Sequence, residues 1–261
     1  MAHIGDRNSV WIQDVGPAVQ EDAPVRLVCF PHAGGAASFY HPLAAEMGEA
    51  AEVLAVQYPG RQDRRHEPAC VTIAELADRV HDEIQAWVDR PLVFFGHSMG
   101  AVVGYEVIRR MQRQGEHSPL GLIVSGRRAP CVSYPPRNLH ERGDAALIDE
   151  LRRQNGTAAG LLENQEVVEM ILPSLRADYR AIETYRHQEG PELTCPITAL
   201  TGREDVAATE EQVRAWENHT HAAFELTLFP GGHFYLSDQW DAVAEVVREC
   251  LTAFARPVAT Y

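Results

Sequence analysis

Residues 92–100 read Leu92-Val93-Phe94-Phe95-Gly96-His97-Ser98-Met99-Gly100, and this stretch decides the fold. Its apolar start is typical of a strand that is buried on both faces. The Gly-x-Ser-x-Gly that follows leads into residues 101–114, where apolar side chains recur at helical spacing. A serine on so sharp a turn adopts a strained backbone, and the two glycines remove Cβ atoms that would clash with strand and helix. The stretch therefore predicts a nucleophile elbow, with Ser98 at the N-terminus of a helix.

The rest of the chain alternates between short apolar runs and longer helical patterns. Apolar runs bounded by glycine and proline predict strands at residues 25–30, 52–57, 92–96, 120–125, 197–201 and 224–229. Helical spacing of apolar side chains predicts helices at residues 73–88, 101–114 and 239–255. This alternation predicts an α/β fold class with a mostly parallel central sheet flanked by helices on both faces.

Residues 137–190 interrupt this alternation. Helical segments are expected at residues 144–154, 165–172 and 175–185, with no strand between them. We therefore expect a helical lid insertion within a single domain that spans residues 1–261. The insertion is rich in apolar side chains, among them Leu161 and Met170, which either pack among its own helices or cover a long apolar substrate.

Composition excludes several classes of function. All 23 basic residues are arginine, so Schiff-base catalysis, a P-loop lysine and pyridoxal phosphate anchoring are excluded. With 37 acidic residues the chain carries a formal charge of −14, which repels nucleic acid and anionic membranes. The five cysteines form no Cys-x-x-Cys pair that would indicate a metal or redox site. No signal-peptide pattern and no apolar run of about 20 residues is found, so we expect a cytoplasmic location.

A serine nucleophile needs an imidazole base and a carboxylate that orients the imidazole. Both residue types follow the last two predicted strands, where Gly-Arg-Glu-Asp ends at Asp205 and Pro-Gly-Gly-His ends at His233. Each lies at the carboxyl end of a strand, where open α/β sheets place their sites. The chain order Ser98, Asp205, His233 is that of α/β-hydrolases and predicts their catalytic triad. Glu204 and Asp238 remain alternatives to Asp205 as the acid.

A glycine-rich loop follows the first predicted strand and reads Phe-Pro-His-Ala-Gly-Gly-Ala. Small residues there allow backbone amides to approach a substrate carbonyl. We expect the amides of Ala33 and Met99 to form the oxyanion hole, with Gly34 as the alternative loop donor. His32 in this loop is a candidate structural hydrogen bonder, and His97, beside the nucleophile, is expected to have a packing role.

With these residues assembled, the chain resembles the type II thioesterases of modular polyketide and nonribosomal peptide synthesis, which are stand-alone α/β-hydrolases. The resemblance spans almost the whole sequence. It rests on Trp11, Cys29-Phe30-Pro31-His32-Ala33-Gly34-Gly35, Tyr58-Pro59-Gly60-Arg61, Gly96-His97-Ser98-Met99-Gly100, Ser125-Gly126-Arg127, Ala129-Pro130, Leu175-Arg176-Ala177-Asp178-Tyr179 and Gly231-Gly232-His233-Phe234-Tyr235. One departure is Val206, where the family often has a proline after the catalytic aspartate.

This resemblance implies a serine hydrolase that removes acyl groups from the phosphopantetheine arm of an acyl or peptidyl carrier protein, with no cofactor and no metal. Such an enzyme clears units that stall the assembly line. A general carboxylesterase or lipase that acts on small acyl esters is the alternative, because it would use the same triad.

An acidic carrier protein would be repelled by a chain of charge −14 unless a local basic patch reversed the field. The candidate arginines follow the second and fourth predicted strands and are Arg61, Arg64, Arg65, Arg127 and Arg128. A guanidinium can also bind the phosphate of the arm through two hydrogen bonds. Alternatively these arginines are solvated or paired with Asp63 and Glu67. The expected substrate-binding residues are His32, Gly34, Arg64 and Arg65.

Overall fold

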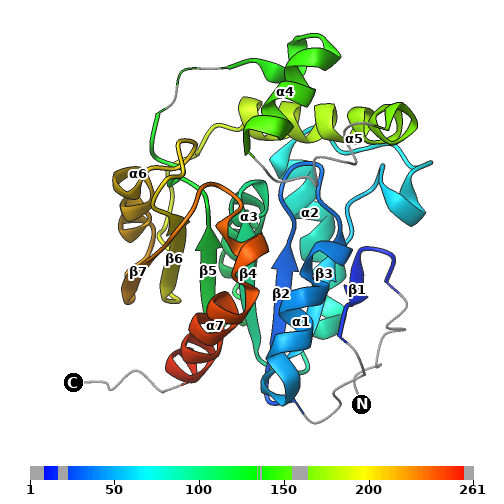
Figure 1. Cartoon of the computed structure of the whole chain (residues 1–261). Helices are drawn as coiled ribbons and strands as arrows, with labels where there is room; N and C mark the ends of the chain where they lie inside the picture. The colour runs from blue at the N-terminus through cyan, green and yellow to red at the C-terminus, as the bar shows by residue number, and fades with distance from the viewer. Residues whose placement is uncertain (1–8, 17–22, 134, 136, 155–163, 256–261) are drawn as a thin grey trace.

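The central sheet has seven strands in the order β1-β3-β2-β4-β5-β6-β7 (Figure 1). It is seen in a computed structural model that describes residues 9–16, 23–133, 135, 137–154 and 164–255. The strands are β1 Ile12–Asp14, β2 Arg26–Phe30, β3 Glu52–Val56, β4 Leu92–His97, β5 Gly121–Ser125, β6 Ile197–Gly202 and β7 Phe224–Phe229. β1 pairs antiparallel with β3, and the other pairings are parallel.

The six predicted strands are all present, and the predicted mostly parallel sheet is confirmed. Every residue of β2, β4 and β5 is buried, which is why these strands read as continuous apolar runs. β1 was not predicted from the sequence. It has three residues at the edge of the sheet, too few to produce a periodic pattern.

Helices cover both faces of the sheet. They are α1 His41–Met47, α2 Ile73–Ile84, α3 Met99–Gln114, α4 Asp144–Gln154, α5 Gln165–Thr184, α6 Glu210–Arg214 and α7 Trp240–Phe254. α2 and α3 pack on one face, and α1 and α7 pack on the other (Figure 1). In the described ranges, no helix combines the length and the apolarity needed to span a bilayer.

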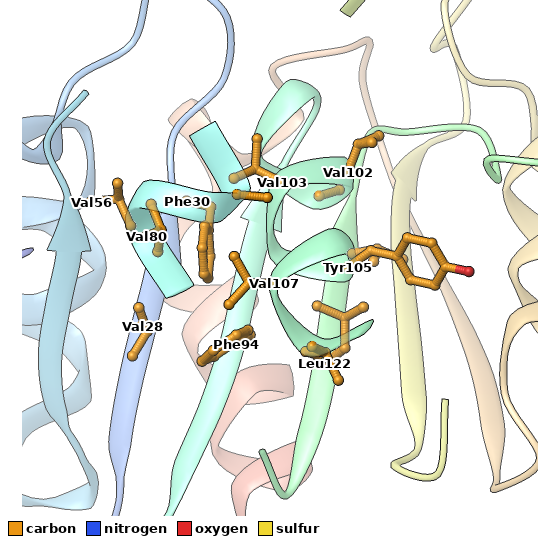
Figure 2. Packing of buried hydrophobic residues seen from close by; sticks show 14 of the residues in the cluster. Val28, Phe30, Val56, Val80, Phe94, Val102, Val103, Tyr105, Val107 and Leu122 are labelled. Carbon is orange, nitrogen blue, oxygen red and sulfur yellow. The ribbon is translucent and has the colours of Figure 1, made fainter. Parts of the chain in front are cut away.

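Alternate residues of the central strands build two separate cores. Val28 and Phe30 of β2 and Phe94 of β4 join Val80 and Val107 on the side of α2 and α3 (Figure 2). The intervening residues of the same strands pack on the side of α1 and α7. Burial on both faces holds the carboxyl ends of these strands in place, and the candidate site is built there.

The insertion differs from the expectation in its helices. α4 begins and ends at the expected residues, but one continuous α5 replaces the two segments expected at residues 165–172 and 175–185. Pro173 lies inside α5 and is exposed, so water can bind the carbonyl that loses its helical partner. Leu172 and Leu175 on either side of it are buried, and their packing keeps the helix continuous.

α4 and α5 lie across the end of the sheet (Figure 1) and share a small core. Its buried members are Leu139, Leu147, Leu151, Val168, Leu172, Leu175 and Tyr179. These seven side chains therefore pack among the insertion's own helices, whereas Ala181 and Ile182 of α5 pack on the main core. Met170 is 56% exposed and takes no part in the small core, and Leu161 lies outside the described residues.

Candidate active site

Ser98 lies on a sharp turn between β4 and α3, with φ 53° and ψ −114°. A Cβ on Gly100 would overlap the carbonyl oxygen of Phe30, and one on Gly96 would stand 2.5 Å from Cα of Ala101. Glycine is required at both positions because α3 approaches β2 and β4 so closely. The strained turn presents the Ser98 hydroxyl at the N-terminus of α3, where the helix dipole favours negative charge.

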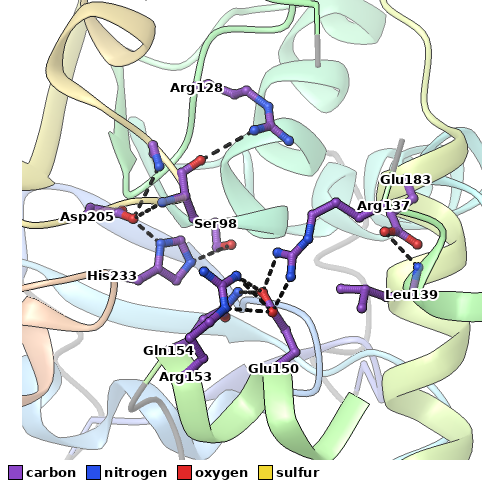
Figure 3. A network of polar contacts seen from close by, with 12 residues as sticks. Ser98, Arg128, Arg137, Leu139, Glu150, Arg153, Gln154, Glu183, Asp205 and His233 are labelled. Atoms are coloured by element: carbon purple, nitrogen blue, oxygen red, sulfur yellow. Dashed lines mark hydrogen bonds and ion pairs between the residues drawn. The ribbon is translucent and has the colours of Figure 1, made fainter. Parts of the chain in front are cut away.

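A chain of hydrogen bonds links Ser98 to Asp205 through His233 (Figure 3). The Ser98 hydroxyl lies 3.0 Å from His233 Nε2, and His233 Nδ1 lies 2.8 Å from Asp205 Oδ2. A carboxylate can only accept, so Nδ1 carries the proton and Nε2 is left as an acceptor for the serine hydroxyl. This is the protonation state that a general base needs.

Backbone amides hold the Asp205 carboxylate in position. Its Oδ1 accepts from the amides of Ala207 (2.8 Å) and Ala208 (3.2 Å), which leaves Oδ2 for His233. The side chain of Asp205 is fully buried, whereas Glu204 and Asp238 are exposed. The geometry therefore favours Asp205 over both alternatives. The loop places Asp205 against His233 even though Val206, not a proline, follows it.

Two further imidazoles pack beside His233. The His97 ring is 5.1 Å from that of His233, and its Nδ1 lies 2.9 Å from the hydroxyl of Ser125, which lies 2.8 Å from the hydroxyl of Tyr235. Burial keeps the pKa of His97 well below its usual range and, with smaller effects of His233 and Arg61, lowers the pKa of His32 to about 3. Both rings are therefore neutral near pH 7.

The expectation that His32 is a structural hydrogen bonder is wrong at Nδ1, which is buried and has no partner among the described residues. Its ring instead packs edge-on against Phe39, with centroids 4.5 Å apart, and Phe234, at 4.7 Å. Sequence reasoning also missed the buried pair Ser125 and Tyr235. Their positions at the end of β5 and two residues after His233 were the available signal.

The candidate oxyanion amides belong to Ala33 and Met99. Neither donates to another group in the part of the chain that the structure describes. The amide of Gly34, the alternative donor, points elsewhere and donates to Asp178 Oδ2 at 2.7 Å. Of the two candidate loop donors, Ala33 is therefore the one whose amide is available for a substrate carbonyl.

A cleft of about 670 Å³ lies over Ser98 and His233. Its walls come from the glycine-rich loop, the start of α3, the segment after β5, and α4 and α5. Beside the triad, Glu150 of α4 receives hydrogen bonds from Arg137, Arg153 and Gln154 (Figure 3). Among the described residues, no three His, Cys, Asp or Glu side chains are grouped as a metal ion would require.

Two of the candidate docking arginines are buried, and the structure corrects their role. Arg61 is 7% exposed and forms two hydrogen bonds with Asp178, at 2.7 and 2.9 Å. Arg64 is 5% exposed, binds Glu67 at 2.9 Å and stacks over the Trp11 ring. Both guanidinium groups are buried and paired with carboxylates of the protein itself, so neither can bind a carrier protein or a phosphate.

The remaining candidate arginines differ in exposure. Arg65 is exposed, whereas Arg127 and Arg128 are half-buried and line the cleft. Their docking role stays a prediction.

The Arg61–Asp178 pair connects three parts of the site: the turn after β3, the glycine-rich loop and α5. Replacing Asp178 by Asn would leave the buried Arg61 charge without its carboxylate. We expect Asp178→Asn to lower the free energy of unfolding by about 3–5 kcal/mol, measured by urea denaturation. Asp144→Asn is the control, because Asp144 is 65% exposed in its pair with Arg176, and it should cost less than about 1 kcal/mol. Equal effects of the two variants would contradict this assignment.

The mostly parallel sheet, the elbow at Ser98 and the order of its hydrogen-bonded partners define an α/β-hydrolase with the site of a serine hydrolase. Comparison with known proteins agrees. The model of the thioesterase domain family matches residues 25–251. Thioesterase PikA5 of Streptomyces venezuelae is 43% identical over 94% of this chain and 86% of its own length.

Solved structures give the same result. The type II thioesterase BorB from the borrelidin biosynthetic cluster is 46% identical, with a TM-score of 0.86 over 93% of this chain and 98% of that one. YbtT, a type II thioesterase from the yersiniabactin pathway, is 32% identical, with a TM-score of 0.84 over 95% of this chain and all of the other. The chain belongs to the thioesterase family and is a type II editing thioesterase of polyketide or nonribosomal peptide biosynthesis.

Proposed function

We propose that this thioesterase removes acyl groups from the phosphopantetheine arm of acyl or peptidyl carrier proteins, with Ser98 as the nucleophile. The observation that carries the proposal is the hydrogen-bonded chain from Asp205 through His233 to Ser98 at the floor of the cleft. The similarity to the type II thioesterase of the borrelidin biosynthetic cluster supports this substrate class. The open cleft has room for a long arm and its acyl group.

The proposed reaction has two halves. His233 Nε2 takes the hydroxyl proton as Ser98 Oγ attacks the thioester carbonyl, and Asp205 stabilises the imidazolium that forms. The amides of Ala33 and Met99 bind the oxyanion. The carbon–sulfur bond then breaks and His233 protonates the departing pantetheine sulfur, so a thiol leaves and the acyl group stays on Ser98. Water, deprotonated by His233, then attacks the acyl carbonyl. The bond to Ser98 Oγ breaks and His233 returns the proton to Oγ, which releases the acid and restores the serine.

Residues 137–190 are proposed as a lid within one domain of residues 1–261. α4 and α5 supply Glu150, Gln154, Tyr179 and Ile182 to the wall of the cleft, which supports this role. Arg127 and Arg128 line the same cleft and are proposed to meet the phosphate of the arm. His32 is proposed to line the acyl site, where its half-buried ring presents an uncharged surface.

A general carboxylesterase or lipase would use the same groups on small oxoesters. The two functions separate when an acyl-pantetheine thioester and an oxoester of equal acyl length are compared. We expect a higher kcat/KM for the thioester on pantetheine. A higher kcat/KM for the oxoester would favour the alternative.

Arg65 is the exposed arginine of the predicted docking patch. We expect Arg65→Glu to raise the KM for an acyl carrier protein about threefold, because a rim charge chiefly affects association with a charged partner. Hydrolysis of a small acyl-pantetheine should not change. Arg79→Glu makes the same change in net charge on the exposed side of α2 and is the matched control. Equal KM values for both variants would remove Arg65 from the docking surface.

A further inference from the structure

The cleft continues along α3 beyond the catalytic residues. Ser98, Val102 and Tyr105 lie on one side of this helix, and all three line the cleft. Tyr105 lies seven positions after Ser98, a distance of about 10 Å along the helix axis. We call the part of the cleft formed by Tyr105, His187 and His219 the distal chamber.

Three of the side chains that line the cleft are apolar and lie on the main core. They are Val102 of α3, Val132 after β5 and Ile182 of α5. These side chains can hold methylene groups but offer no hydrogen bond. A linear acyl group that enters along this wall would reach the distal chamber after about eight chain atoms, at about 1.3 Å per bond.

The distal chamber is polar, and two of its nitrogen atoms have no partner. His219 is 4% exposed, and its Nδ1 lies 3.1 Å from the hydroxyl of Tyr105. Its other nitrogen, Nε2, is buried and has no hydrogen-bond partner among the described residues, and the same holds for Nδ1 of His187. A buried polar atom without a partner weakens the free protein, so it calls for an explanation in terms of a ligand.

The charges around the distal chamber restrict the ligand. Burial, with smaller effects of His187 and Arg109, lowers the pKa of His219 to about 4, so the ring is neutral near pH 7. The Arg109 guanidinium donates hydrogen bonds to Glu106 and to the carbonyl oxygen of Gln188. Glu189, Glu192 and Arg186 line the same cleft, so carboxylates and a guanidinium both lie near this chamber. The neutral imidazole of His219 offers a hydrogen bond without a charge, which fits an uncharged oxygen.

We propose that His219 Nε2 binds an uncharged oxygen, a hydroxyl or keto group, carried about eight atoms from the thioester carbonyl on the acyl chain. When the Tyr105 hydroxyl donates to Nδ1, the ring proton lies on Nε2, which can then donate to that oxygen. The site thereby selects oxygenated acyl chains over plain hydrocarbon chains of the same length. This inference rests on the proposed function, because it uses the thioester carbonyl at Ser98 as its origin.

The test compares octanoyl-pantetheine with its terminal-hydroxyl analogue. Their ratio of kcat/KM, hydroxylated over plain, should fall about tenfold in His219→Phe, since an aromatic ring keeps the packing against Trp216 and Tyr105 but removes both nitrogens. His117→Phe at an exposed position is the matched control and should leave the ratio unchanged. A ratio within twofold of the wild-type value in His219→Phe would overturn the proposal.

An amide of the pantetheine arm offers the same chemistry as the acyl oxygen. Repeating both acyl groups on N-acetylcysteamine removes the distal part of the arm and distinguishes these sources. The tenfold effect of His219→Phe should persist on the shorter thiol. An effect that disappears with the arm would place the arm at His219 and would overturn the acyl assignment.

A second measurement does not depend on turnover or on the folding of His219→Phe. In Ser98→Ala protein labelled with ¹⁵N-histidine, the hydroxylated thioester should shift the Nε2 resonance of His219, and the plain thioester should shift it less. Equal shifts would contradict the proposal. Hydrolysis of the thioester by Ser98→Ala would instead contradict the proposed function, so the two failures are distinguishable.

Discussion

Ser98→Ala is expected to abolish thioester hydrolysis while the protein stays folded. The loss in kcat should reach roughly three to six orders of magnitude, because the residual rate would come from the oxyanion amides and from binding alone. The turn itself should survive, since alanine and serine place a Cβ in the same strained backbone, at φ 53°. Release of free thiol from acyl-pantetheine measures the rate.

The matched control is Ser237→Ala, which removes an exposed hydroxyl of the short helix after His233. It should hydrolyse and bind a fluorophosphonate probe like the wild type. Ser98→Ala should bind none of the probe. Full labelling of Ser98→Ala, or turnover near the wild-type rate, would show that another residue is the nucleophile.

Asp205→Asn is expected to lower kcat by about 10⁴-fold. The asparagine amide would donate to His233 Nδ1, so the ring proton would move to Nε2 and the imidazole could no longer accept from Ser98. Glu204→Gln is the control one residue away, and its side chain is exposed. It should change kcat less than threefold.

Steady-state kinetics on the same acyl-pantetheine settles which carboxylate acts. If Glu204→Gln proved the more damaging variant, the hydrogen bond from His233 to Asp205 would not be the catalytic one. Circular dichroism of both proteins separates a loss of chemistry from a loss of fold.

The sequence predicted those parts of the fold whose patterns are local. β4 and the elbow lie within nine residues, and the approach of α3 demands glycine at two of them, so the motif carries its own geometry. β2, β3, β5 and β6 are also fully buried and were predicted from runs of apolar residues. The prediction left residues 173 and 174 between two helical segments, whereas packing on both sides of Pro173 keeps α5 continuous.

The ion pairs could not be predicted, since they join distant parts of the chain. Arg61 and Asp178 are 117 residues apart, and the loop around Arg61 reads as a solvated basic turn. The stacking of Arg64 on Trp11 is equally invisible in sequence. Burial of these two guanidinium groups moves the docking hypothesis to Arg65 and to the arginines of the cleft.

The distal chamber is also a product of the tertiary structure. Tyr105 and His219 come from α3 and from the segment after α6, and neither carries a recognisable motif. From the sequence, both read as ordinary helix or surface residues. Only the folded chain brings both residues into the cleft that holds Ser98, where they can contact the acyl group.

Intact-mass spectrometry of an acylated carrier protein, before and after incubation with the enzyme, tests the central claim most directly. The account predicts that the carrier loses the mass of its acyl group, keeps its phosphopantetheine arm, and stays acylated when Ser98→Ala replaces the wild type. An unchanged acyl-carrier mass under conditions in which the same enzyme hydrolyses a small oxoester would contradict it.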